Sequence, residues 1–259
     1  MFREPLCAVT VCLGYGDFLA QTAKINAAHF DKWTVVTSAA DDETRHVCRV
    51  FGMHCLVTED GTRDGTFSKG RMIERGLQHL AADAWILHLD ADTVYPSTFR
   101  RSLERAHLDD RKIYGFDRFM VKNWADWRRL EASGWAANPH GEYSNSVCVP
   151  QGFQLGPRWV DTDGWVPIGY GQLWSRKGGQ EEWFGRRVKP HPLGHGSACR
   201  SDVQHGLQWD RRDRVLLPEV LVAHLESEPC VNGANWSGRA TKRFGPDARP
   251  GPAGNPSPS

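Results

Sequence analysis

The sequence lacks several patterns that would assign a protein class at once. Its seven cysteines are scattered and form no Cys-x-x-Cys pair, so neither a disulfide framework nor a zinc ribbon is indicated. No apolar run is long enough to cross a bilayer, and the opening MFREPLCAVTVCLG carries no signal-peptide cleavage pattern. We therefore expect a cytoplasmic protein (in the host cytoplasm if virus-encoded) with no integral membrane association.

Charge of one sign and phosphate-binding fingerprints are also missing. The 32 basic residues are balanced by 31 acidic ones, so bulk electrostatics predict no nucleic-acid partner, although a local basic groove stays open. The chain contains no Gly-x-x-x-x-Gly-Lys loop and no Gly-x-Gly-x-x-Gly fingerprint. Both a P-loop and a Rossmann dinucleotide site are therefore disfavoured.

What the first hundred residues do contain is an alternation of short apolar runs with amphipathic segments. Continuous apolar strands between helices predict an α/β fold with a parallel sheet covered on both faces. Ligands of such sheets bind outside the carboxyl ends of the strands. The expected strands are 6–13, 33–37, 54–58 and 84–89, and the expected helices are 17–29 capped by Asp17, 42–52 opened by Asp41 or Asp42, and 68–80 capped by Ser68.

From about residue 113 the pattern becomes rich in glycine, proline and tryptophan. Seven of the eleven tryptophans lie between positions 124 and 183, where aromatic faces would fill core or form a binding surface. We expect a loop-rich half with long, partly antiparallel connections. A helix over 201–210, a late strand over 219–227 and a disordered tail over 246–259 complete the prediction.

The stretch AWILHLDADTVYP, residues 84–96, ends a buried strand with two carboxylates. Residues two apart on an extended chain face the same way, so Asp90 and Asp92 would reach one hard cation together. Mg²⁺ and Mn²⁺ are commonly held by one or two carboxylates together with substrate phosphates. A bare Asp-x-Asp is common and often forms a solvated turn, but its place at the end of a buried strand favours a metal site.

Three further positions are candidates for chemistry, and each has a structural alternative. His224, in VLVAHLES, is either a hydrogen-bonded core residue or a third metal ligand beside Asp92. Ser201 and Gln204 form a capping-box pattern that places Asp202 at the first helical position, where it would serve the helix dipole or act as a general base. Lys69 and Arg71 lie at a helix start, where they would meet a phosphate or form a solvated basic face.

A rival metal site is the segment HPLGHGSAC. It places His191, His195 and Cys199 at regular spacing, and zinc accepts such ligands. No fourth ligand is evident, so a structural zinc is the less favoured interpretation.

The order of these features resembles the GT-A class of nucleotide-sugar glycosyltransferases, of a family 2-like type, over roughly residues 5–245. The matching segments are LDAD at 89–92, GYGQLW at 169–174, RSDVQHGLQW at 200–209, LPEVLVAHLESE at 217–228 and GANWSGR at 233–239. The resemblance implies one catalytic domain, 1–245, with a nucleotide-sugar half (1–110) and an acceptor half (111–245). It also implies Mn²⁺ or Mg²⁺ and a nucleotide-sugar donor, most often a UDP-sugar.

The resemblance further implies roles for individual residues. Asp90, Asp92 and His224 would bind the metal, and Asp202 would act as the general base of an inverting transfer. Ser201 stands where many such enzymes have Glu, which puts the assignment of Asp202 in doubt. The expected donor-binding residues are Gly14, Tyr15, Asp17, Thr37, Ser38, Asp60, Lys69, Arg71, Asp90 and Ala91, and the expected acceptor-binding residues are Trp124, Tyr170 and Trp174.

The acceptor hydroxyl is the least determined element. A saccharide or small molecule is the simplest choice, and a hydroxymethylated base in DNA is the alternative. The segment RFMVKNWADWRRL, residues 118–130, is compatible with DNA contact, but an amphipathic helix with a solvated basic face is the preferred interpretation. A metal-dependent nucleotidyltransferase and a non-catalytic nucleotide-sugar-binding module remain as competing functions.

Overall fold

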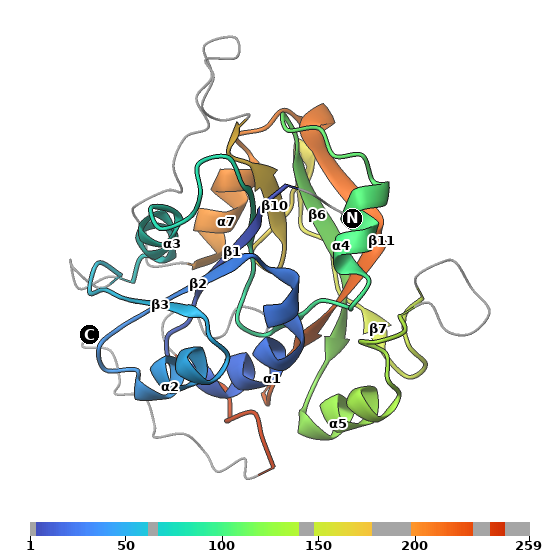
Figure 1. The fold of residues 1–259 in the computed structure, drawn as a ribbon. Helices are drawn as coiled ribbons and strands as arrows, with labels where there is room; N and C mark the ends of the chain where they lie inside the picture. The colour runs from blue at the N-terminus through green and yellow to red at the C-terminus, as the bar shows by residue number, and fades with distance from the viewer. Residues whose placement is uncertain (1–3, 62–66, 140–147, 178–197, 230–238, 247–259) are drawn as a thin grey trace.

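The structure is a computed structural model, and it describes residues 4–61, 67–139, 148–177, 198–229 and 239–246. Figure 1 shows a curled sheet with helices on both of its faces. Within the described part, no helix is both long enough and apolar enough to cross a membrane.

The elements alternate between strands and helices through the first half and become irregular in the second. The strands are β1 (Leu6–Val11), β2 (Lys32–Thr37), β3 (His54–Val57), β4 (Trp85–His88), β5 (Thr93–Val94), β6 (Ile113–Val121), β7 (Gln154–Leu155), β8 (Val160–Asp161), β9 (Gly164–Trp165), β10 (Gln172–Ser175) and β11 (Arg214–Leu225). The helices are α1 (Gly16–Asn26), α2 (Asp42–Val50), α3 (Lys69–Leu77), α4 (Phe99–Arg105), α5 (Trp124–Ala132) and α7 (Ala198–Gly206), with short 3₁₀ turns at Ala27–His29 and Arg211–Asp213.

The main sheet joins the two halves of the chain. Its strand order in the described residues is β3-β2-β1-β4-β10-β6-β11-β5, and β7 pairs with β6 off this path. β3, β2, β1 and β4 are mutually parallel, as the apolar runs predicted. β10 runs antiparallel to both β4 and β6, so the second half continues the sheet rather than forming a separate one.

The two faces of the sheet are packed by different helices. One face carries apolar side chains of α1, α2 and α4, including Leu19, Val47 and Phe99. The opposite face carries Met72 and Ile73 of α3. Helices cover both faces of β1–β4, so a ligand would bind at the carboxyl ends of these strands. The loop after β4 and the loop before β10 meet at this edge.

Local signals fixed several helix starts correctly. Asp41 caps α2 by accepting from the amide of Thr44, and Ser68 caps α3 by accepting from the amide of Arg71. The predicted cap at Asp17 is wrong, because α1 begins at Gly16 and its N-cap is Tyr15. The predicted capping box at Ser201 is also wrong, because α7 begins at Ala198 and Asp202 lies more than a turn inside the helix.

The basic stretch 118–130 is not one amphipathic helix, as had been the preferred interpretation. It divides into the end of β6 and the helix α5, with Asn123 capping the helix between them. Arg118 therefore lies on a strand, whereas Arg128 and Arg129 lie on a helix.

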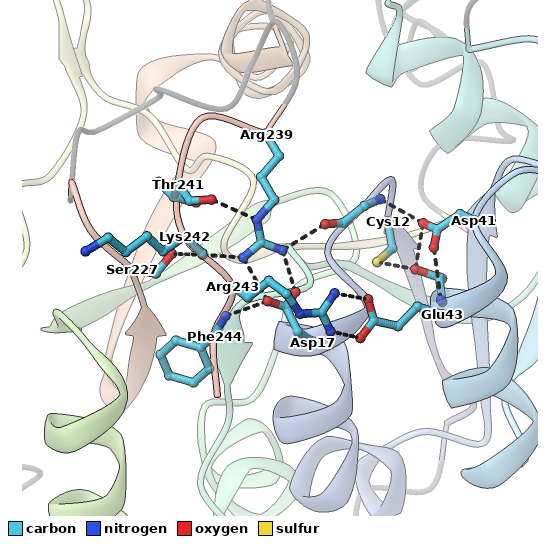
Figure 2. A network of polar contacts seen from close by, with 12 residues as sticks. Cys12, Asp17, Asp41, Glu43, Ser227, Arg239, Thr241, Lys242, Arg243 and Phe244 are labelled. Atoms are coloured by element: carbon cyan, nitrogen blue, oxygen red, sulfur yellow. Dashed lines mark hydrogen bonds and ion pairs between the residues drawn. The ribbon is translucent and has the colours of Figure 1, made fainter. Parts of the chain in front are cut away.

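The last described segment returns to the beginning of the chain (Figure 2). Arg239 pairs with Asp17 through two bonds, Nη1 to Oδ1 at 2.6 Å and Nη2 to Oδ2 at 2.7 Å. The amide of Phe244 also donates to Asp17 Oδ2 at 2.6 Å, and its ring stacks on Phe18. Arg243 forms a two-pronged ion pair with Glu43 beside it. This segment, 239–246, is thereby fastened to α1 and α2.

Candidate active site

The loop after β4 is held rigidly at the edge of the sheet. The hydroxyl of Thr10 donates to the carbonyl of Leu89, and the hydroxyl of Thr22 donates to the carbonyl of Ala91, at 2.9 and 2.8 Å. These buried bonds fix the backbone on both sides of Asp90. The carboxylate is consequently presented by a positioned turn rather than by a free loop.

Lys69 joins this edge to the second half of the chain. Its ammonium nitrogen lies 2.6 Å from Asp90 Oδ1 and 2.9 Å from Asp202 Oδ2. The Lys69 side chain is 9% exposed and that of Asp202 is 6% exposed, whereas Asp90 keeps 29%. The three predicted residues are thus brought together, with a buried cation between two carboxylates.

Gly169 allows this cluster to close. A Cβ at this position would stand 2.3 Å from Asp202 Oδ2, 2.7 Å from Lys69 Nζ and 2.9 Å from Asp90 Oδ2. Any side chain would therefore push into the charged groups, and only glycine lets the backbone pass this close. The segment GYGQLW contributes to the site through this missing side chain, a role that the sequence pattern did not reveal.

His88 and Gln172 lie next to Asp202, and the sequence pattern predicted a role for neither. Gln172 Nε2 donates to the main-chain carbonyl of Asp202 at 2.8 Å, and its Oε1 lies 3.2 Å from His88 Nδ1. The same His88 nitrogen lies 3.7 Å from Asp202 Oδ1. His88 and Gln172 are both fully buried. Their one sequence signal is a polar residue at the end of a short buried strand.

Burial and the shared cation shift the titration of these groups in different directions. At Asp202, burial raises the pKa and prevails over the attraction of Lys69. At Asp90, burial also opposes ionisation, but Lys69 and the nearby imidazoles lower the pKa below its usual value. Burial would lower the pKa of Lys69, but the two carboxylates raise it, so the ammonium stays charged. Burial lowers the pKa of His88, which favours the neutral imidazole.

Asp92 and His224 form a second pair beside this cluster. His224 Nε2 lies 3.4 Å from Asp92 Oδ1, and the turn that carries Asp92 is linked to β11 by the bond from the Leu225 amide to the Asp92 carbonyl. Asp92 Oδ1 and His224 Nδ1 are buried and accept or donate no hydrogen bond among the described residues. Neighbouring ligands of an octahedral Mg²⁺ ion, bound at about 2.1 Å, lie about 3 Å apart.

The pair therefore fits a divalent cation better than the predicted trio does. Asp90 is turned toward Lys69, and within the described ranges no three His, Cys, Asp or Glu side chains are placed to hold a metal ion. Two protein ligands are nonetheless sufficient for Mg²⁺-like ions when substrate phosphates supply further oxygens. Asp92 and His224 are consequently the residues that would hold the metal, and Asp90 would join only on leaving Lys69.

The residues expected to bind the nucleoside lie at the ends of β1, β2 and β3, but several are already engaged. The Gly14 amide donates to Asp41 and its carbonyl accepts from Arg239. Both carboxylate oxygens of Asp17 are used by Arg239, which leaves little for a donor nucleotide. Of the others, Thr37 bonds to Asp41, Asp60 pairs with Arg75, Tyr15 stacks on Phe18, Ala91 is buried, and Ser38 and Arg71 are half-buried.

The three aromatic residues expected at the acceptor are separated. Tyr170 is buried next to the site, with its ring 6.4 Å from that of His224. Trp174 lies inside β10, is 4% exposed and packs against His205, so it has little surface to offer an acceptor. Trp124, the first residue of α5, contacts Phe244. The alternative zinc ligands His191 and His195, and the side chain of Cys199, lie outside the described residues.

Comparison with known proteins identifies the architecture. No protein-family model and no curated protein sequence matches the chain. Glucosyl-3-phosphoglycerate synthase from Mycobacterium tuberculosis, in complex with phosphoglyceric acid, superposes with a TM-score of 0.50 and 15% identity. The match covers 91% of this chain and 76% of the synthase.

Two further structures are more distant. Mannosyl-3-phosphoglycerate synthase from Rubrobacter xylanophilus gives a TM-score of 0.36 at 18% identity, and this chain covers only 41% of that protein, which covers 46% of this one. The inositol-1-phosphate CTP transferase from T. maritima gives 0.44 at 12% identity, over 87% of this chain and 91% of the transferase. With the strand order and the carboxylates at the end of β4, the match to the mycobacterial synthase establishes that this chain has the GT-A fold.

Proposed function

We propose that this chain is a metal-dependent glycosyltransferase that moves a sugar from a nucleotide diphosphate sugar, preferably a UDP-sugar, to an acceptor hydroxyl. The observation that carries the proposal is the convergence of Asp90, Lys69 and Asp202 at the carboxyl edge of the sheet, beside the Asp92–His224 pair. The fold shared with a glucosyl-transferring synthase supports it.

In the proposed reaction each of these residues would have a separate role. Asp92 and His224 would hold Mn²⁺ or Mg²⁺, which supplies Lewis-acid stabilisation to the leaving diphosphate. Lys69 would add a buried positive charge that a diphosphate can share with the carboxylates. Asp202 would accept the proton of the acceptor hydroxyl as it attacks the anomeric carbon, with inversion. Its raised pKa makes it a stronger base than an ordinary carboxylate.

Ser201 does not weaken this assignment in the way that the sequence suggested. The Glu of the Glu-Asp pattern is replaced by Ser201, but Lys69, His88 and Gln172 all surround Asp202. Lys69 binds the carboxylate, Gln172 fixes the backbone of Asp202, and the His88 ring lies 3.7 Å from Oδ1. This arrangement supports Asp202 as a single general base.

A small acceptor is favoured over DNA. The basic stretch that suggested DNA contact is divided between β6 and α5. Arg128 pairs with Glu131 and Arg129 pairs with Asp126, so their charges are already balanced on the surface of the helix. A nucleic-acid backbone would need a continuous basic surface, which this segment does not supply.

The test is release of UDP from UDP-sugars by the purified protein, with and without Mn²⁺. We expect slow metal-dependent hydrolysis without acceptor, loss of turnover in Asp202→Asn, and loss of metal dependence in Asp92→Asn and His224→Gln. Asp110→Asn, at an exposed carboxylate, is the matched control. Full turnover in Asp202→Asn would remove the general base, and full turnover in both metal-ligand variants would remove the metal site.

A further inference from the structure

Arg118 is held in a fixed orientation near the site without an acidic partner. Its guanidinium carbon lies 4.4 Å from the centre of the Tyr170 ring, so the cation stacks on the aromatic face. The backbone of Gly156 lies close to the same side chain, because a Cβ there would stand 2.8 Å from Arg118 Nε. The Gly156 amide also donates to the Arg118 carbonyl at 2.8 Å. Stacking on Tyr170 and the close backbone of Gly156 restrict the position of the Arg118 guanidinium.

The charge of Arg118 remains uncompensated in the described part of the chain. Arg158, from the same region, forms two bonds with Asp117, whereas Arg118 forms no hydrogen bond and no ion pair through its side chain there. Its Nε is buried without a partner, and the residue as a whole is half-buried. A guanidinium that is pre-oriented in this way presents a planar fork that matches a carboxylate or a phosphate.

The register of the sheet places Arg118 close to the reacting groups. On neighbouring parallel strands, Arg118 pairs with Val222 and Met120 pairs with His224, so Arg118 and His224 share one face two residues apart. Tyr170, on which Arg118 stacks, also lies beside His224. Tyr170 directly follows Gly169, the residue that touches Asp202 and Lys69. The guanidinium therefore lies near the same edge of the sheet, beside Tyr170 and on the face that carries His224.

We propose that Arg118 binds an anionic group, a phosphate or a carboxylate, on the acceptor and so directs the acceptor hydroxyl toward Asp202. This inference rests on the proposed function and narrows the acceptor to small anionic molecules. Lys69 and a cation held by Asp92 and His224 would meet the charge of the donor diphosphate, which leaves Arg118 for a second anionic group. A half-buried cation stacked on Tyr170 is suited to one anionic group rather than to a polymer backbone.

Three probes of similar size separate the alternatives: glycerol, glycerate and glycerol 3-phosphate. Binding is measured by isothermal titration to the full chain with Mn²⁺ and UDP present. We expect at least one anionic probe to bind ten-fold or more tightly than glycerol. Glycerate and glycerol 3-phosphate then distinguish a carboxylate site from a phosphate site.

Substitutions of Arg118 test whether this residue causes the preference for anionic probes over glycerol. Arg118→Gln should abolish the preference for the anionic probe while leaving the affinity for UDP with Mn²⁺ unchanged. Arg118→Lys should retain part of it, because lysine keeps the charge but not the planar fork. Arg128→Gln, at an exposed arginine on α5, should change nothing. Thermal melting of each variant checks that the fold is kept.

Equal binding of glycerol and both anions to the unaltered protein, or an unchanged preference in Arg118→Gln, overturns the inference. A defect confined to a charged donor, tested with UDP-glucuronate, would move the anion site to the donor and overturn the acceptor assignment. An Arg118-dependent anion preference in a protein that does not bind UDP would instead overturn the proposed function, while the anion site itself would stand.

Discussion

Lys69 and Asp202, 133 positions apart in the sequence, are joined by a buried bond of 2.9 Å between Nζ and Oδ2. The same ammonium reaches Asp90, so one cation is shared by two carboxylates from different halves of the chain. In the proposed reaction Asp202 is the general base; its Oδ2 is bound to Lys69, and its Oδ1 forms no hydrogen bond among the described residues. A donor diphosphate at this edge would compete with the two carboxylates for the ammonium, so we expect donor binding to affect the base.

Replacing Lys69 by methionine should therefore affect both stability and turnover. Two carboxylates would be left near each other without their cation, and loss of one partner of a buried pair typically costs about 3–5 kcal/mol. We expect the low end of this range, because the Asp90 side chain keeps 29% exposure. Urea unfolding measures the loss, and Lys24→Met, at an exposed lysine, is the control. A Lys69→Met protein as stable as the control would contradict the buried bridge.

Gly169→Ala tests the closeness of the backbone to this cluster. The added methyl group would overlap Asp202 Oδ2 at 2.3 Å and must force the carboxylate or Lys69 to move. We expect turnover to fall by a factor of about 10² or more, since misplacement of a catalytic group by about 1 Å has this effect. Gly245→Ala, where a Cβ meets nothing within 4 Å, should retain activity. Normal kinetics in Gly169→Ala would mean that the cluster tolerates displacement.

The ion pairs that fasten segment 239–246 to α1 and α2 should differ in their contribution to stability. Arg239→Met would leave Asp17 buried, with a side chain only 4% exposed, and should cost about 3–5 kcal/mol. Arg243→Met removes an ion pair whose side chains are 48% and 38% exposed, and should cost about 0–1 kcal/mol. Chemical denaturation of the two variants side by side measures the difference. Similar losses in both would show that burial of Asp17 does not matter.

His205 makes a prediction about pH. Burial, with a smaller contribution from His88, lowers its pKa to about 3. Below the ordinary pKa of about 6.5, the unfolded chain binds a proton that the folded chain excludes, so stability falls as pH falls. Between pH 6.5 and 5 this group alone should remove about 2 kcal/mol.

The check is a set of urea titrations at several pH values. His205→Gln should flatten the dependence on pH by about one proton relative to the unaltered chain, whereas His46→Gln, at an exposed histidine, should leave the slope as it was. Carboxylates also titrate in part of this range, so the contribution of His205 is taken from the difference in slope between His205→Gln and His46→Gln. An unchanged slope in His205→Gln would mean that this imidazole is protonated in the folded state.

The sequence was informative wherever one segment determined its own structure. The apolar runs predicted the parallel strands, and Ser68 and Asp41 marked helix starts through a local bond to the backbone three residues on. The predicted start of α7 was wrong, because the residues before Ser201 continue the helix and no local signal stops them. The placement of Asp90 and Asp92 after a buried strand likewise followed from the local pattern.

Relationships between distant segments could not be predicted in this way. Nothing near Lys69 indicates that its partners are Asp90 and Asp202, since those contacts depend on how β10 and α7 pack against β4. His88 looks like one more strand residue until Gln172 is placed beside it. The engagement of Asp17 by Arg239 was likewise invisible, because it depends on the return of a segment 222 positions away.

That return has a consequence for synthesis of the protein. Asp17 leaves the ribosome 222 residues before Arg239, the cation that pairs with it. Until Arg239 and Phe244 emerge, α1 must leave this carboxylate and the face of Phe18 in water. The first strands can pair during translation, but the β1–α1 corner closes only after nearly the whole described chain has been made.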